Sequence, residues 1–280
     1  MDTIAFWCLN PEVVFKEIAS SAKAVILTSG TLAPMETFSS ELGVKFDHIL
    51  EALHVIERGQ VWVGAVGIGP TGTELKGTFK ELETFAFQDD ICKAILDICK
   101  VVPHGVLCFL PSYSFMDKLL KRMELINVLS ELKKYKKVFS EPRQGASKEF
   151  ERLMASYYKV IADTHSPSPS SKLTGGIFFA VYRGKVSEGL DFADENARAV
   201  ISVGIPYPAF KDEKVVQKRA YNDIYGKEHG LLNGHLWYEK QAYRALNQAL
   251  GRCIRHKNDW GAVILLERRF HHDTSVAGLL

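Results

Sequence analysis

Residues 105–113, GVLCFLPSY, carry the pattern that decides the fold, an uncharged apolar run that stops at a proline and a serine. Such a run is typical of a strand buried on both faces, and Ser112 is placed to cap a helix after it. Similar runs rich in β-branched and aromatic residues recur at residues 24–27, 61–66, 177–182, 199–203 and 262–266. We therefore expect a sheet whose strands are buried on both faces.

Helical patterns fill intervals between these runs, at residues 87–101, 112–134, 148–160, 212–225 and 237–255. Apolar strands that alternate with helices predict an α/β fold, in which right-handed crossovers build a parallel sheet flanked by helices. Ligands of such folds bind outside the carboxyl ends of the strands. Functional residues are therefore expected where the predicted strands end.

The composition excludes several classes of protein. The chain has 280 residues, of which 24% are charged and 46% hydrophobic, within the range of globular proteins. Because no apolar run nears the ~20 residues of a membrane span, and no basic segment precedes an apolar stretch at the start, we expect neither a membrane protein nor a secreted one. With 35 basic and 33 acidic residues the net charge is +2, so nucleic-acid binding has to come from local charges.

The cysteines and two polar segments carry no predicted chemistry. Because the five cysteines show no CxxC or CxxH spacing, we expect reduced core residues and no metal site. They are Cys8, Cys92, Cys99, Cys108 and Cys253. The lysines of residues 133–137 are expected on a solvated face near a helix end, in preference to a polyanion contact. The Ser/Pro-rich residues 163–176 are expected to form a surface loop.

Hydroxyl groups follow two of the predicted strands. In residues 24–34, AVILTSGTLAP, Thr28 and Ser29 would either relay hydrogen bonds from a nucleotide pocket or cap a turn. After the strand at 105–110, N–H groups of the helix start attract phosphate, and Tyr113 would stack on a base or sugar. Taken singly, each pattern favours local capping or a core tyrosine.

Residues 184–192, GKVSEGLDF, form the densest polar segment after a predicted strand. Lys185 and Ser187 are suited to bind phosphate oxygens, and Asp191 is suited to a ribose hydroxyl or an arginine. The glycines allow the backbone to approach a ligand closely. From the residues alone, a ligand-binding loop and an ordinary polar turn remain equally supported.

The predicted helix at 237–255 carries Arg244, Gln248, Arg252 and Arg255 at spacings of four, four and three. At ~100° per residue these side chains project from one side, opposite an apolar face. Two guanidinium groups beside a glutamine suit a phosphate chain, because each offers a planar fork of donors and keeps its charge. The alternative is a stripe of surface arginines paired with carboxylates. The pattern of this helix, considered without other evidence, favours that alternative.

A complete nucleotide site is missing from the sequence. Residues 64–72, GAVGIGPTG, follow a predicted strand but lack the GK[ST] ending of a P-loop, and no DEAH or DEAD box occurs. The chain therefore lacks an obvious magnesium ligand or water-activating carboxylate. We expect it to supply half of a nucleotide site and to hydrolyse no ATP alone.

In chain order, TSGTLAP, LCFLPSY, GKVSEGLDF and NQALGRCIRH resemble motifs III, IV, V and VI of superfamily 2 helicases of the iron–sulfur, XPD-like branch. The resemblance covers nearly the whole chain apart from the Ser/Pro-rich loop. It implies an ATP-driven DNA-repair helicase of the nucleus, which moves 5′ to 3′ on single-stranded or forked DNA. Residues 1–43 would be the tail of the first RecA-like motor domain, and residues 44–280 the second motor domain.

The resemblance also implies roles for individual residues. Gln248, Arg252 and Arg255 would face ATP, with Arg255 as the arginine finger, and Glu188, Gly189 and Asp191 would also lie at the ATP site. The DNA contacts would come from Ser112, Tyr113, Lys185 and Ser187, while Thr28 and Ser29 would couple the two events. The first motor domain would complete the site for ATP and Mg²⁺, and that domain alone would hold the [4Fe–4S] cluster. The segment at 206–208 is similar to one that lines the DNA path, although a rigid turn explains it equally well.

Two other functions remain open from the sequence. The α/β domain would serve as a non-catalytic module that docks nucleic acid or a protein partner, if no P-loop and DEAH box accompany it. A small-molecule enzyme on a doubly wound sheet rests on fold analogy alone.

Overall fold

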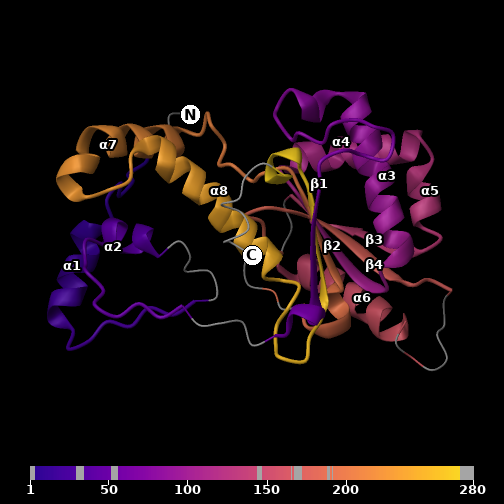
Figure 1. Ribbon diagram of the computed structural model, residues 1–280, viewed down its shortest axis with the longest axis horizontal. Helices are drawn as coiled ribbons and strands as arrows, with labels where there is room; N and C mark the ends of the chain where they lie inside the picture. The colour runs from indigo at the N-terminus through magenta and orange to yellow at the C-terminus, as the bar shows by residue number, and fades with distance from the viewer. Residues whose placement is uncertain are drawn as a thin grey trace. The chain divides into compact units, whose positions relative to one another are not determined.

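The computed structural model describes residues 4–29, 35–51, 56–143, 147–164, 166, 172–187, 190 and 192–271. The chain divides into two compact units (Figure 1). The smaller unit is drawn from Met1–Leu53 and Tyr207–Arg244, and the larger from His54–Pro206 and Ala245–Leu280. The domain boundary that we place after residue 43 stays a prediction.

The larger unit is built on a six-stranded sheet with the order β1-β6-β5-β2-β4-β3. Every neighbouring pair is parallel, as the alternating pattern predicts. The strands are β1 Val61–Val66, β2 His104–Leu110, β3 Lys136–Ser140, β4 Gly175–Val181, β5 Ala199–Val203 and β6 Gly261–Leu266. In the centre Leu110 of β2 lies opposite Val181 of β4, so these two strands end side by side.

Helices cover both faces of this sheet. They are α3 Phe85–Val101, α4 Tyr113–Leu125, α5 Val128–Leu132 and α6 Ser147–Thr164, with 3-10 helices η1 Arg58–Gln60, η2 Glu81–Glu83, η3 Asp194–Ala197 and η4 Arg268–His271. Helices α3, α4 and α5 pack on one another and share a core with Ile177 and Phe179 of β4. Since side chains alternate along a strand, Phe178 points to the other face of the sheet. There its ring packs edge-on against the ring of Tyr157 of α6, with 5.5 Å between the ring centres. The predicted helix-covered α/β sheet is confirmed.

The smaller unit consists of α1 Glu12–Ser21, α2 Glu36–Leu42, α7 Glu213–His229 and the first part of α8 Gly234–Leu250. The buried ammonium of Lys218 ties it together, because its Nζ donates to the carbonyl of Leu9 at 2.7 Å and to Glu41 Oε2 at 2.9 Å. Asp212 caps the start of α7, and Gly230 ends that helix in a left-handed conformation.

The predicted strand at 24–27 is wrong. No strand is assigned there, and the side chain of Ile26 is 86% exposed. A strand needs a neighbour for its N–H and C=O groups, and all strands among the described residues belong to the larger unit. The apolar run therefore lies in the smaller unit without a sheet to join.

The prediction of a solvated lysine run is wrong at one residue. Lys133, Lys134 and Lys137 are exposed, but Lys136 begins the unpredicted strand β3 and is fully buried. Its Nζ donates to the carbonyls of Val102 at 2.7 Å and His104 at 2.9 Å. A lysine is tolerated at this depth because backbone carbonyls accept from its ammonium.

Two other expectations can be compared with the structure. Four of the cysteines are buried as predicted, whereas Cys8 is exposed. The expected single helix at 112–134 is divided into α4 and α5, because Asn127 between them adopts a left-handed conformation with φ of 60°. Of the helices that the structure describes, none combines the length and apolar composition of a membrane span.

Candidate nucleotide and nucleic-acid site

The segments after β2 and β4 lie next to each other, because these strands pair and end at the same level. The N–H group of Tyr182 extends the pairing by donating to the carbonyl of Leu110 at 3.2 Å. Ser112 and Tyr113 begin α4 directly after β2, and Lys185 and Ser187 lie in the loop after β4. The parallel sheet thus brings together the side chains predicted to contact DNA.

Ser112 and Tyr113 both have local partners. The hydroxyl of Ser112 caps α4 by accepting from the N–H of Phe115 at 3.1 Å. The hydroxyl of Tyr113 donates to Glu141 Oε1 at 3.1 Å, and burial together with that carboxylate raises the pKa of Tyr113 to about 12. The predicted cap is confirmed, whereas a DNA contact at these residues stays a prediction.

Glu141 is a buried carboxylate that our sequence reasoning missed. It follows β3 directly, and besides the Tyr113 hydroxyl it accepts from the N–H of Lys185 at 2.6 Å and of Val181 at 3.1 Å. Its position directly after a strand is the signal that could have identified Glu141, but we did not predict β3. The loop after β4 is therefore attached to the strand end beside it.

The loop at 182–187 exposes one of its two predicted phosphate ligands. Lys185 is exposed, with its Nζ 5.5 Å from the centre of the Phe150 ring. Ser187 is buried instead, and its hydroxyl donates to the carbonyl of Gly184 at 2.8 Å. Glu188, Gly189 and Asp191, which we predict at the ATP site, lie outside the residues that the structure describes.

The arginines do not lie on one helix as predicted. Helix α8 ends at Leu250, not at residue 255. Beyond it the chain tightens, since the N–H of Arg252 donates to the carbonyl of Ala249 at 3.2 Å, in the three-residue spacing of a 3-10 turn. Gly251 favours this ending because glycine is a poor helix former. Arg252 and Arg255 therefore project from a turn and a loop.

These two guanidinium groups nevertheless meet. Arg252 Nη1 donates to the carbonyl of Leu190 at 2.6 Å, and Arg255 Nη2 donates to the same oxygen at 3.0 Å. Arg252 Nη2 also donates to the carbonyl of Ser187 at 2.6 Å. Arg252 is half-buried and Arg255 is exposed, so a pair of permanent positive charges lies against the loop after β4.

The remaining predicted residues are placed as follows. Gln248 is half-buried on α8, one turn before Arg252. Arg244 belongs to the smaller unit, where it donates to Thr37 Oγ1 at 2.7 Å and where burial lowers the pKa of its guanidinium. Thr28 and Ser29 are exposed in that same unit, and their coupling role stays a prediction.

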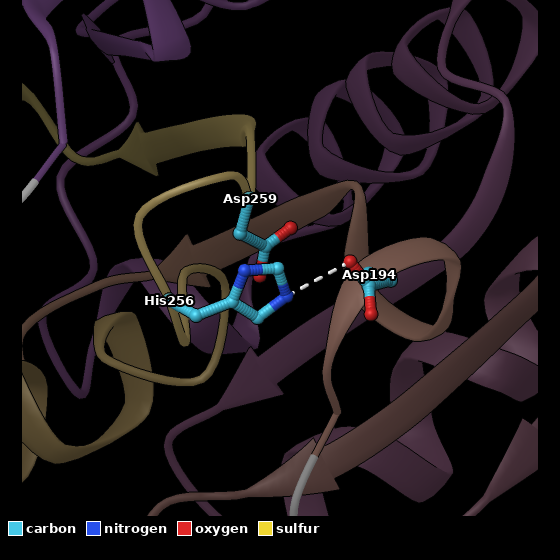
Figure 2. Close-up of side chains that lie close together, drawn as sticks. All are labelled: Asp194, His256 and Asp259. Carbon is cyan, nitrogen blue, oxygen red and sulfur yellow. Dashed lines mark hydrogen bonds and ion pairs between the residues drawn. The ribbon is translucent and has the colours of Figure 1, made fainter.

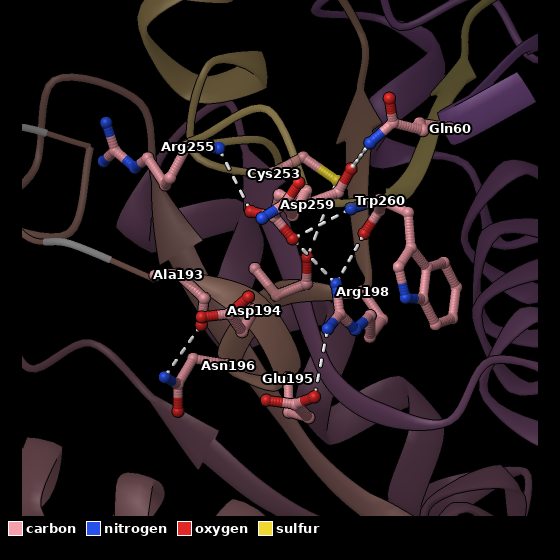
Figure 3. A network of polar contacts seen from close by, with 12 residues as sticks. Gln60, Ala193, Asp194, Glu195, Asn196, Arg198, Cys253, Arg255, Asp259 and Trp260 are labelled. Carbon is pink, nitrogen blue, oxygen red and sulfur yellow. Dashed lines mark hydrogen bonds and ion pairs between the residues drawn. The ribbon is translucent and has the colours of Figure 1, made fainter. Parts of the chain in front are cut away.

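A buried ion pair fixes the loop that carries Arg255 (Figure 3). Arg198 Nη1 donates to Asp259 Oδ1 at 2.8 Å, and Asp259 Oδ2 accepts from the N–H of Arg255 at 3.0 Å. The guanidinium of Arg198 also lies over the ring of Trp260, 4.4 Å from its centre. The backbone of Arg255 is thereby held by a carboxylate that is itself neutralised.

Asp194 and His256 cluster with Asp259 of this ion pair, and the possible ligand atoms of the three residues lie within 4.8 Å of one another. Figure 2 shows His256 Nε2 directed at Asp194, and the atoms lie 3.0 Å apart. Both oxygens of Asp259 already accept hydrogen bonds from Arg198 and from two backbone N–H groups. We therefore interpret the cluster as a hydrogen-bonded network and assign it no metal.

The cysteines do not fit an iron–sulfur cluster. Cys92, Cys99 and Cys108 pack among apolar side chains of the hydrophobic core, where burial raises the pKa of the Cys92 and Cys99 thiols to about 12, and Cys8 is exposed. Cluster ligands are thiolates. Among the described residues, the one group with metal-ligand distances contains no cysteine.

Comparison with known proteins identifies the class of protein. Residues 95–279 match the model of the Helicase C-terminal domain family, so the chain belongs to that family. A solved structure titled XPD_Helicase superposes with a TM-score of 0.63 at 21% identity, over 96% of this chain and 44% of that one. The predicted RecA-like fold and the XPD-like resemblance are confirmed.

Individual relatives narrow the class. The chain is 53% identical over 268 residues to the Fanconi anemia group J protein homolog of Gallus gallus, covering 96% of this chain and 21% of that protein. It is 41% identical over 281 residues to Regulator of telomere elongation helicase 1 of Bos taurus, covering 99% of this chain and 22% of that protein. The chain thus spans about a fifth of the length of these relatives.

Proposed function

We propose that this chain is the second motor half of an ATP-dependent DNA helicase, which acts in DNA repair in the nucleus and moves 5′ to 3′. Residues 1–43 are then the tail of the first motor domain, and residues 44–280 form the second. The observation that carries the proposal is the convergence of Arg252 and Arg255 on one carbonyl in the loop after β4. The family of the chain and the names of its relatives support it.

The guanidinium pair fits a nucleotide triphosphate. Two fixed positive charges with several N–H donors match the charge and the oxygen-rich surface of a phosphate chain. Arg255, the more exposed of the two, stabilises negative charge on the transferring phosphoryl group. Arg252 binds phosphate while it holds the Ser187 carbonyl, and Gln248 lies one turn before it.

ATP supplies the free energy for movement when it is bound between two motor domains. The chain has no P-loop or DEAH sequence, so the other domain contributes most phosphate contacts and the ligands of Mg²⁺. The [4Fe–4S] cluster that the resemblance implies would likewise belong to that domain. Glu188, Gly189 and Asp191 complete the side of the site that this chain provides.

Single-stranded or forked DNA binds where β2 and β4 end. Lys185 is exposed and attracts the phosphate backbone, while the first turn of α4 after Ser112 presents N–H groups. Tyr113 and Ser187 contribute by holding these segments in place, since both side chains bond to groups of the protein. Thr28 and Ser29 couple this site to ATP.

The test is ATP turnover with and without single-stranded DNA, in the 280-residue chain alone and in a protein that joins it to a P-loop motor domain. We expect DNA-stimulated hydrolysis from the joined protein and none from the chain alone. Magnesium-dependent hydrolysis by the pure chain would contradict the proposed division of the site. DNA binding without hydrolysis in the joined protein would favour a docking module.

A further inference from the structure

We propose that Glu141 is a positioning residue, which holds the DNA-binding segments after β2 and β4 in register with the arginine pair. The inference rests on the function proposed above and deepens it. Glu141 is 1% exposed and lies outside the resembling motifs, so it acts through its neighbours and touches neither DNA nor ATP.

Both carboxylate oxygens of Glu141 are engaged. Oε1 accepts from the hydroxyl of Tyr113 at 3.1 Å and from the N–H of Lys185 at 2.6 Å, while Oε2 accepts from the N–H of Val181 at 3.1 Å. Burial of a carboxylate is costly unless donors satisfy it, and these three donors come from two different segments. One side chain therefore clamps the start of α4 to the loop after β4.

Gly184 shows how closely the loop approaches this carboxylate. A Cβ atom at Gly184 would lie 2.5 Å from Glu141 Oε1 and 2.8 Å from the carbonyl of Val181. Real Cβ atoms do not come so near, so a side chain here would displace the loop or the carboxylate. The glycine is required by the clamp itself.

The clamp continues to the arginine pair through a short length of chain. Lys185 is bound to Glu141 through its N–H, and two residues later the carbonyl of Ser187 accepts from Arg252. The Ser187 hydroxyl closes the intervening turn by donating to Gly184. Glu141 and Arg252 therefore hold the loop after β4 at two separate points, the N–H of Lys185 and the carbonyl of Ser187.

Glu141→Gln tests the clamp with a side chain of equal size. Its NH₂ group has to face a backbone N–H of Lys185 or Val181, because it replaces one acceptor oxygen by a donor. We expect amide exchange in residues 182–187 of the 280-residue chain to quicken about tenfold, while exchange in β2 and β4 is unchanged. Glu131→Gln on the exposed face of α5 is the matched control.

Binding and turnover provide the functional measurement. We expect Glu141→Gln to weaken the affinity for fluorescein-labelled oligothymidine about tenfold, measured by anisotropy. In the joined motor protein the DNA concentration for half-maximal ATPase stimulation should rise equally, whereas KM for ATP stays within about twofold. A merely structural role would change both constants. If Glu141→Gln does not fold, Tyr113→Phe removes one donor and should weaken DNA affinity in the same direction.

The outcomes separate the inference from the proposed function. Unchanged amide exchange or unchanged DNA affinity in the folded Glu141→Gln variant would overturn the role of Glu141. Failure of the unmodified chain and of the joined protein to bind oligothymidine would instead overturn the proposed function.

Discussion

Arg198 and Asp259 form an ion pair 2.8 Å long in which the two side chains are 4% and 0% exposed. Removing one partner of such a pair costs about 3–5 kcal/mol. Without Asp259 the buried guanidinium of Arg198 would keep Glu195, 3.1 Å away, as its remaining carboxylate partner. Since Asp259 also accepts from the N–H of Arg255, the same carboxylate connects the stability of the larger unit with the position of the proposed arginine finger.

Asp259→Asn should therefore lower the free energy of unfolding by about 3 kcal/mol or more, measured by urea denaturation. Asp194→Asn is the matched control, because Asp194 is half-exposed and bonds only to the exposed His256 among the contacts found for it. We expect the control to change stability by less than about 1 kcal/mol. Equal urea midpoints for Asp259→Asn and the unmodified chain would contradict the conclusion that the buried Arg198–Asp259 pair stabilises the larger unit.

Added metal should leave the protein unaffected. Because Arg198 and two backbone N–H groups occupy the oxygens of Asp259, titration with Zn²⁺ or Mg²⁺ should release no binding heat from this cluster. Stoichiometric heat that disappears in His256→Ala would show instead that the three side chains bind a cation.

Gly184→Ala should disturb the loop after β4, because the added Cβ would collide with Glu141 and with the carbonyl of Val181. We expect a loss of about 1–3 kcal/mol in stability and weaker oligothymidine binding. Gly59→Ala serves as the control, since nothing lies within 4 Å of the Cβ it would add. Equal thermal midpoints and DNA affinities for the two variants would count against the close packing at Gly184.

Lys136 should make stability depend on pH in the alkaline range. Burial lowers the pKa of Lys136 from 10.5 to about 8, so between these values the unfolded chain binds more protons than the folded one. Stability from this residue therefore rises with pH across that window, by about 3 kcal/mol relative to Lys136→Met. Urea midpoints measured from neutral pH to about pH 11 test this, with the exposed Lys137→Met as control. If the difference in urea midpoint between Lys136→Met and the unmodified chain does not change with pH over this range, the lowered pKa of Lys136 is contradicted.

Much of the fold could be predicted because buried parallel strands leave a direct trace in the sequence. The apolar runs at β1, β2, β4, β5 and β6 correspond to observed strands within one or two residues. The strand β3 escaped because it lies at the sheet edge and begins with two lysines. Sequence patterns cannot show that the carbonyls of Val102 and His104 converge on Lys136.

The candidate site could be predicted in its segments but not in its contacts. The order of the motifs predicts that the loop after β4 and the residues around Arg252 belong to one site, and the structure joins these two segments by hydrogen bonds. Helical spacing wrongly extended α8, since the helix yields to a tighter turn beyond Leu250. The role of Glu141 could not be predicted from the sequence, because the groups that donate hydrogen bonds to it lie on separate segments of the chain.

The most direct measurement is the rate of DNA-stimulated ATP hydrolysis by Arg255→Ala in the protein that joins this chain to a P-loop motor domain. We predict that kcat falls by about three orders of magnitude or more while oligothymidine affinity stays within about twofold. Arg58→Ala, which alters an exposed arginine of η1, should keep full turnover. Undiminished ATP hydrolysis by Arg255→Ala would contradict the account that the guanidinium pair completes the ATP site.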